Sequence, residues 1–236
     1  MSSKSASDSV DFGSRTIAYG IRFTTRKTLG ITVTPEMAVE VTAPFGSAAE
    51  RIRELVKRKA RWIQKQQRFF LTFHPRPSPR QYRSGETHFY LGRQMLLRVH
   101  EGRNPGVRYQ GRALEVNVRE KAQAKALLER WYRERAREKF TEILEKVSDR
   151  FVKFNVTPTS LHLKRMAGRW GSCSQTGGIT LHPDLVMAPR GCIEYVLIHE
   201  LCHRVHRNHD QKFWDFQLRM MPDWKKWKLK LERQLA

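Results

Sequence analysis

Three histidines and one glutamate near the C-terminal end of the chain have the spacing of a metal-binding motif. His199, Glu200 and His203 form the pattern H-E-x-x-H, and His209 follows after five intervening residues. On a helix, His199 and His203 lie on one face, about 6 Å apart along the axis, so one ion can accept a nitrogen from each. Glu200 lies one step around the helix, where it can act on a water molecule instead of the ion. The motif therefore predicts a hydrolytic zinc site with Glu200 as its catalytic group.

The residues around the motif favour a metal site over an ordinary amphipathic turn. Residues 193–198 are mostly apolar, which predicts that the motif lies on a buried helix. A buried glutamate and two buried histidines are costly unless something binds them. We therefore expect an ion at this position.

The third ligand has two candidates, His206 and His209. His206 falls on nearly the same helical face as His203, but a full turn beyond the point where the ion would lie. Asn208 is a residue type that tolerates the left-handed conformation at a helix end, so we expect the chain to turn there. His209, directly after this turn, is the better candidate, and we interpret His206 as a solvated or hydrogen-bonded histidine. Because His206 replaces the glycine of the metzincin motif, we do not expect the chain to belong to that group.

Length and composition are those of a globular protein without a membrane segment. The 236 residues, 39% of them hydrophobic, suffice for a catalytic domain with a smaller module. No stretch approaches about 18 consecutive apolar residues, and residues 1–8 lack the apolar core of a signal peptide. The cysteines, Cys173, Cys192 and Cys202, are odd in number and form no C-x-x-C pair, in agreement with a reducing compartment. We expect a cytoplasmic protein with no membrane partner.

The chain is strongly basic, with 45 Lys and Arg against 23 Asp and Glu and a net charge of +22. Such a surface attracts polyanions. Residues 51–68 alone hold eight basic side chains. Two interpretations stay open: a solvated basic surface with no specific partner, or weak binding of nucleic acid or nucleotides. No helix-turn-helix or zinc-finger spacing is present, so we do not expect sequence-specific binding.

The sequence pattern divides the chain into three segments. We expect a disordered leader over residues 1–9, a β-rich module with one basic helix over 10–120, and the catalytic domain over 121–236. The sequence shows no internal repeats.

Periodic patterns predict an α+β protein. Apolar residues at helical spacing predict helices over 52–70 and from 121 to about 152. We expect Trp62, on the first helix, to pack in the core or at its boundary. Alternating and β-branched segments predict strands, those at 17–23, 31–34 and 39–42 forming a small antiparallel meander and others lying at 87–92, 95–99, 107–109 and 113–118.

The C-terminal part predicts the catalytic core. A strand at 160–166 is followed by a Gly- and Ser-rich loop over 167–177, a strand at 178–181 and the motif helix. Two strands of an antiparallel sheet joined by a hairpin loop, followed by an H-E-x-x-H helix, form a zincin-like core of the α+β class.

Several motifs together resemble one family. They are Arg169–Ser174, Ile179–Leu181, His199–His203, Asn208–His209 and Phe213–Trp214, with Tyr90–Gly92 upstream. With these residues the chain resembles the YgjP-like metallopeptidase family, which is similar to the SprT-like and WLM zinc proteases. The resemblance implies a minigluzincin-type α+β fold with one zinc ion. It also implies that His199, His203 and His209 are the ligands and Glu200 the catalytic glutamate.

The loop before the last strand, and that strand itself, are candidates for substrate binding. The glycine and serines of the loop, Ser172 among them, suit an approach to the ion, and Arg169 could hold a carboxylate or phosphate through two nitrogens. The alternative is structural, with Trp170 packed and Arg169 paired to a buried acid. A peptide could also add to the strand 178–181, beside Ile179.

Three functions fit these features. The first is a zinc metallopeptidase in which Glu200 activates water. The resemblance also admits a metal-dependent nucleoside triphosphate pyrophosphatase acting on UTP, which would use the same chemistry. The third is a nucleic-acid-associated binding protein with a structural metal. Three protein ligands leave a fourth position open for water, and this favours catalysis.

Overall fold

The computed structural model describes residues 5–34, 36–71, 80–166 and 168–235. They form two compact units that divide between residues 77 and 78. We expected the division at residue 120. The structure places it earlier because the strands between residues 87 and 118 share one hydrophobic core with the motif helix.

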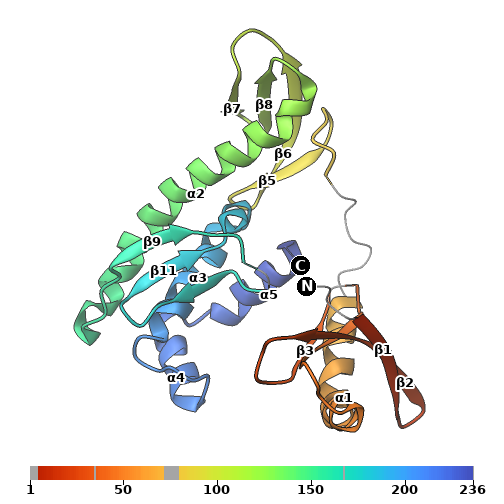
Figure 1. Cartoon of the computed structure of the whole chain (residues 1–236). Helices are drawn as coiled ribbons and strands as arrows, with labels where there is room; N and C mark the ends of the chain where they lie inside the picture. Colours follow the sequence, from red (N-terminus) through yellow and green to blue (C-terminus); the bar gives the residue numbers. More distant parts are fainter. Residues whose placement is uncertain (1–4, 35, 72–79, 167, 236) are drawn as a thin grey trace. The chain divides into compact units, whose positions relative to one another are not determined.

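The first unit is a four-stranded sheet with one helix. The strand order is β1-β2-β4-β3, and the elements are β1 (Ser5–Phe12), β2 (Arg15–Thr24), β3 (Gly30–Val33), β4 (Val39–Pro44) and α1 (Ala49–Leu71). The central pair, β2 and β4, is parallel. The predicted antiparallel meander is therefore wrong, because the β3–β4 hairpin places β4 beside β2 in the same direction. Figure 1 shows this unit with α1 beside its strands.

Strand β1 lies where we expected a disordered leader. It pairs with β2 along its full length. Asp8 accepts hydrogen bonds from the Tyr19 hydroxyl at 3.0 Å and from Arg53 Nε at 2.8 Å. These contacts order a segment whose composition alone is polar, so residues 5–9 belong to the sheet.

Helix α1 has the predicted single apolar face. Ile52, Val56, Ala60 and Ile63 are buried against the sheet. Trp62 does not join this core, because its side chain lies on another side of the helix and is 40% exposed. The expectation that Trp62 packs in the core or at its boundary is therefore wrong.

The second unit begins with another four-stranded sheet followed by a long helix. Its order is β5-β6-β8-β7, and its elements are β5 (Thr87–Tyr90), β6 (Arg93–Glu101), β7 (Gly106–Gln110), β8 (Ala113–Val118) and α2 (Ala124–Ser148), with short 3₁₀ helices η1 (Lys121–Gln123) and η2 (Asp149–Phe154) at the two ends of α2. Its outer pairs are antiparallel and its central pair is parallel, as in the first unit. The chain thus contains the same topology twice, although the sequence shows no repeat.

The rest of the second unit carries the motif. It contains a three-stranded sheet of order β10-β11-β9, with β9 (Ser160–Leu163), β10 (Gly171–Cys173) and β11 (Gly178–Leu181), then η3 (Pro183–Met187), α3 (Arg190–Cys202), α4 (Gln211–Met220) and α5 (Trp224–Leu235). The protein is a mixed α+β structure with five α-helices in its described residues. The predicted hairpin differs, because the loop contains β10, while β9 and β11 pair in parallel.

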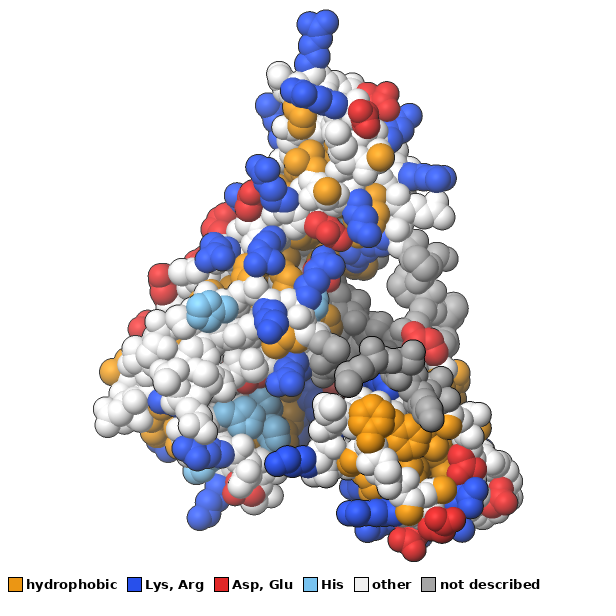
Figure 2. All heavy atoms as spheres, in the orientation of Figure 1, with side chains coloured by type: hydrophobic (Ala, Val, Ile, Leu, Met, Phe, Trp, Pro, Cys, Tyr) orange, Lys and Arg blue, Asp and Glu red, His pale blue; other side chains and the backbone are white. Residues whose placement is uncertain are grey.

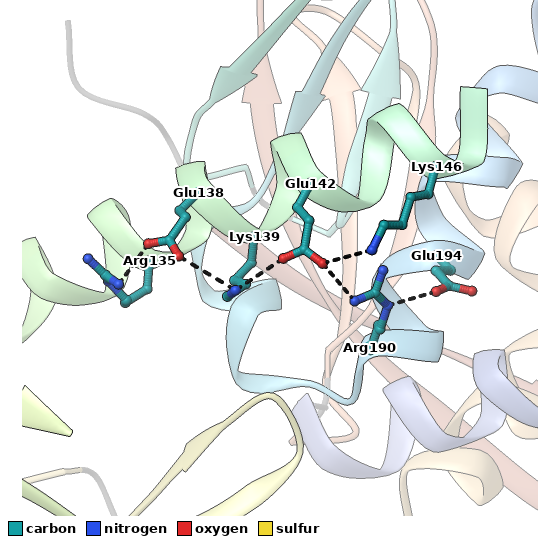
Figure 3. Close-up of polar contacts among 7 residues, drawn as sticks. All are labelled: Arg135, Glu138, Lys139, Glu142, Lys146, Arg190 and Glu194. Carbon is teal, nitrogen blue, oxygen red and sulfur yellow. Dashed lines mark hydrogen bonds and ion pairs between the residues drawn. The ribbon is translucent and has the colours of Figure 1, made fainter. Parts of the chain in front are cut away.

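Helix α2 joins the sheet of the second unit to the motif helix. Along its length it contacts β7, β8, β9, η3 and α3. Near its end, Glu142 accepts hydrogen bonds from Lys139 at 3.1 Å, Arg190 at 3.0 Å and Lys146 at 3.2 Å (Figure 3). Lys139, then Arg190 and Lys146, lower the pKa of Glu142 to about 2. Since Arg190 is the first residue of α3 and also pairs with Glu194, this network attaches the start of the motif helix to α2.

Candidate metal centre

The motif residues lie where α3 ends. His199 and Glu200 are in its last turn, and His203 is the residue directly after Cys202. The chain then reverses through turn hydrogen bonds, including His206 N to the Cys202 carbonyl at 2.9 Å. The predicted left-handed residue Asn208 is not the cause of this reversal, because its φ is not positive. The helix ends several residues earlier than the sequence indicated.

The reversal brings the three predicted histidines together. The nearest ligand nitrogens of His199, His203 and His209 all lie within 4.8 Å of one another. Nε2 of His209 and Nε2 of His199 are 3.1 Å apart. His209 is exposed, and Figure 2 shows histidine side chains gathered at the surface on the face in view. The imidazole of His206 is not in this cluster and lies instead 5.5 Å from the Phe216 ring.

Helix α4 holds His209 in place from the other side. Asp210, the residue before α4, accepts the Phe213 amide hydrogen at 3.0 Å and so caps the helix. Trp214 Nε1 donates to the His209 carbonyl at 3.1 Å, and the Trp214 ring stacks on the His209 ring at 5.3 Å. The third histidine is therefore fixed by the start of a helix that the sequence patterns did not predict.

Two of the histidines make hydrogen bonds that orient their rings. His199 Nδ1 is 2.8 Å from Gln217 Oε1, and His203 Nδ1 is 3.3 Å from the His206 carbonyl. Both partners are oxygen acceptors, so each Nδ1 carries the proton and each Nε2 keeps its lone pair. This tautomer is the one that presents Nε2 to a metal ion.

Burial also suits the histidines to a metal. It lowers the pKa of His199 to about 4, with smaller contributions from the charges of His203 and His209. Burial and His203 lower the pKa of His209 as well. Metal binding requires neutral imidazoles, and these shifts keep both rings neutral at neutral pH. The donor set therefore fits a divalent metal ion.

Glu200 is buried beside this cluster without being part of it. Burial raises its pKa to about 7, although the charge of Arg169 and a hydrogen bond from the Cys173 amide oppose the shift. A Cβ atom at Gly171 would lie 2.9 Å from Glu200 Oε1 and 2.8 Å from Val196 Cγ1, so only glycine fits there. The backbone at Gly171, the first residue of β10, thus packs directly against the Glu200 carboxylate.

The predicted substrate-binding residues have different surroundings. Arg169 is exposed and close enough to Glu200 to lower its pKa. Trp170 packs on the His182 ring at 5.3 Å, as the structural alternative expects. Ser172 is half-buried, with its hydroxyl 3.9 Å from Met166 Sδ. Ile179 is fully buried in the central strand, so its side chain serves the core and not a substrate.

Gln217 is the site residue that the sequence reading missed. Its side chain is fully buried on α4, and its Nε2 has no hydrogen-bond partner in the described part of the chain. Phe213, Phe216 and Met220 occupy the other buried positions of this helix. A glutamine at such an apolar-periodic position, eight residues after the third histidine, is the signal that could have identified it.

Comparison with known proteins assigns the family. Residues 27–234, well over half of the chain, match the family described as YgjP-like, metallopeptidase domain. The chain belongs to the YgjP-like family. As a metallopeptidase family, it implies a hydrolase with a divalent metal ion. The described residues contain no helix long and apolar enough to cross a membrane.

One solved structure and the curated proteins complete the comparison. The metallopeptidase zymogen abylysin of Pyrococcus abyssi is 22% identical, with a TM-score of 0.36, over 41% of this chain and 94% of the abylysin chain. No curated protein matches the sequence.

Proposed function

We propose that this YgjP-like protein is a zinc-dependent metallopeptidase in which Glu200 acts as the general base. The observation that carries the proposal is the convergence of the His199, His203 and His209 nitrogens beside a buried glutamate. Three imidazole ligands suit zinc and leave one of its four positions open. When bound, zinc would polarise the carbonyl of the scissile bond and make a water molecule easier to deprotonate.

Glu200 would move the proton. Its pKa of about 7 lies where a carboxylate can accept a proton from water and later return it to the leaving amine. The Cys173 amide and the packing at Gly171 hold the carboxylate in one place. Glu200 thus has both a pKa and a fixed position that suit a general base.

We infer that a peptide substrate binds along β10 and not along β11. Strand β11 has β10 on one side and β9 on the other, so neither of its edges is available. Strand β10 has a partner on one side only among the described residues. Ser174 donates to Gly178 across the β10–β11 pair, so the preceding Cys173 amide points to the open side, where it meets Glu200. An added strand there would run past the catalytic carboxylate.

Arg169 supports both substrate classes that we considered. Its exposed guanidinium near Glu200 could bind an acidic side chain or C-terminal carboxylate of a peptide. The same group and the net charge of +22 favour a nucleoside triphosphate pyrophosphatase as the second candidate. A structural metal is the weakest candidate, because it would need a fourth protein ligand. We also retain a cytoplasmic location as a proposal, consistent with three free cysteines.

Metal analysis of the purified protein tests the proposal. We expect about one zinc per chain, and loss of that zinc in His203→Ala. His206→Ala is the matched control, because the His206 ring lies outside the cluster, and it should keep the zinc. A wild-type protein without zinc after metal supplementation, or equal zinc in both variants, would refute the site.

A substrate screen separates the two enzymes. Quenched-fluorescent peptide libraries should be cleaved by the wild type and not by Glu200→Gln. Release of pyrophosphate from UTP, with no peptide cleavage, would replace the first candidate with the second.

A further inference from the structure

The outward side of α1 carries a row of cations, which Glu54 interrupts between Arg51 and Arg58 and which is continuous from Arg58 to Arg68. Ile52 and Val56 mark the buried face of the helix. On the opposite face, basic residues follow one another at intervals of seven, three, four and three residues. These residues are Arg51, Arg58, Arg61, Lys65 and Arg68, and all five are exposed. We call them the α1 basic row. Because α1 rises about 1.5 Å per residue, neighbours from Arg58 onwards lie roughly 4.5 to 6 Å apart along the axis.

The charges of the α1 basic row are not neutralised within the unit. Among the described residues, α1 forms one ion pair, between Arg53 and Asp8 of β1. This pair lies on the side of the helix near the sheet. In the described chain, Arg58, Arg61 and Lys65 contact no carboxylate. The helix has two acidic residues, Glu50 and Glu54, both in its first two turns. The C-terminal two-thirds of the row therefore presents unpaired positive charge.

An exposed aromatic ring lies on one flank of this row. Trp62 is 40% exposed, four residues after Arg58 and three residues before Lys65. On the other flank of the row, Arg61, Gln64, Lys65 and Arg68 line a shallow depression of about 590 Å³, to which Trp62 does not contribute. A large apolar ring left in water beside cations is unexplained by the fold, because Trp62 is outside the core of its unit.

We propose that the α1 basic row binds single-stranded nucleic acid, with cations on the phosphates and Trp62 stacked on a base. Regular cations flanking an aromatic ring are the combination that holds single strands without sequence preference. A duplex would offer phosphates but no open base face to Trp62. An anionic membrane fits less well, because a helix at a bilayer surface needs an apolar face, and α1 buries its apolar face in its own sheet.

This surface is independent of the proposed peptidase activity. It is built from α1 in the first unit, whereas the histidine cluster and Glu200 lie in the second. Nucleic-acid binding should therefore survive Glu200→Gln and zinc removal. Failure of either proposal leaves the other standing.

Binding of the full-length protein to fluorescein-labelled oligo(dT) of 20 nucleotides tests the inference by fluorescence anisotropy. If four cations contact phosphates, log K should fall against log salt with a slope of about −3. The triple variant Arg58→Glu, Arg61→Glu, Lys65→Glu should bind roughly a hundredfold more weakly at low salt. The control variant Arg103→Glu, Arg119→Glu, Lys121→Glu changes the net charge equally at exposed positions of the second unit and should bind within about threefold of wild type.

The tryptophan supplies a second readout. Trp62→Ala should lose about tenfold in affinity for oligo(dT), as expected for one stacked base. Phe45→Ala, which removes a 60% exposed ring from the same unit, should lose nothing. Equal losses in the two charge-reversal variants, or an unchanged affinity in Trp62→Ala, would overturn the proposal. Binding to phosphatidylserine vesicles but not to oligo(dT) would also overturn it, in favour of a membrane. Circular dichroism checks that each variant is folded.

Discussion

The two four-stranded sheets share one topology, yet the helices that follow them are used differently. Strands β1–β4 with α1, and β5–β8 with α2, have the same order and the same parallel central pair. Helix α1 buries one face, against its own sheet. Helix α2 also covers β9, η3 and α3, and its nine buried residues are spread around several sides, from Ala124 to Val147.

The difference shows how one architecture can serve two purposes. Once α2 is apolar on more than one side, it needs further elements to cover it, and the motif helix α3 is one of them. The turn of the β5–β6 hairpin adds to this attachment, because the Leu91 and Gly92 amides donate to carbonyls of η3 directly before α3. Helix α1 has no second apolar face, so its outward side is free to be charged. The second sheet and helix thus support the metal centre, while the first unit offers a basic surface.

The largest expected effect separates the chemistry of the two regions. Glu200→Gln should reduce peptide turnover by about 10² to 10⁴, the contribution typical of general base catalysis, while zinc content stays at the wild-type level. The Arg58, Arg61, Lys65 charge reversal on α1 should leave turnover of a short neutral peptide unchanged. Steady-state kinetics measure both, and a comparable loss in the α1 variant would mean that the regions are not functionally separate.

Core truncations test whether α2, and not α1, supports the site. Phe140→Ala should cost about 3–5 kcal/mol, because this fully buried ring lies between elements of the second unit. Ile63→Ala should cost about 2–5 kcal/mol within the first unit. We expect calorimetry to show destabilisation in both, but weaker zinc retention on heating only in Phe140→Ala. Identical zinc loss in the two variants would contradict the distinction.

Gln217 sharpens the description of the second region. Gln217→Leu removes the oxygen that accepts from His199 Nδ1, and it should weaken zinc binding about 10- to 100-fold in a chelator competition. Gln217→Glu keeps an acceptor and should recover most of the affinity. Gln211→Leu, at an exposed position of the same helix, is the control that should bind zinc normally. Equal affinities for the Leu and Glu variants at position 217 would remove its positioning role.

The smallest effect concerns two surface ion pairs: Asp8–Arg53, which joins β1 to α1, and Glu142–Arg190, which joins α2 to α3. The folded-state pKa values of Glu142 and Asp8 are both lowered to about 2, from ordinary values of 4.5 and 3.8. Each carboxylate therefore stabilises its unit above its ordinary pKa, and this contribution is lost as the pH falls towards 2. Urea unfolding from pH 7 to 3 should show a flatter pH dependence in Glu142→Gln than in wild type. Because both groups are at the surface, the change should be smaller than for the core truncations.

Local patterns in the sequence accounted for much of the fold. The helical periods of Ile52, Val56, Ala60 and Ile63 correctly predicted α1, and the long helix after residue 121 is also confirmed. The pairing of the strands was harder to predict from the sequence. Sequence order suggested antiparallel neighbours for the first strands and for the two strands before the motif helix, but β2 with β4 and β9 with β11 are parallel. In both sheets, as in the sheet in which β6 and β8 are parallel, a strand later in the chain is inserted between earlier ones.

The sequence by itself determined which residues form the candidate metal centre, namely His199, His203 and His209 with Glu200 beside them. The H-E-x-x-H spacing and the distance to His209 depend on short-range geometry, and the matched family covers these residues. Only the tertiary structure decided that β10, unlike β11, has a strand partner on one side only among the described residues, that Ile179 is buried, and that Gln217 orients His199. Those properties depend on contacts between residues far apart in the chain, which residue type and periodicity do not encode.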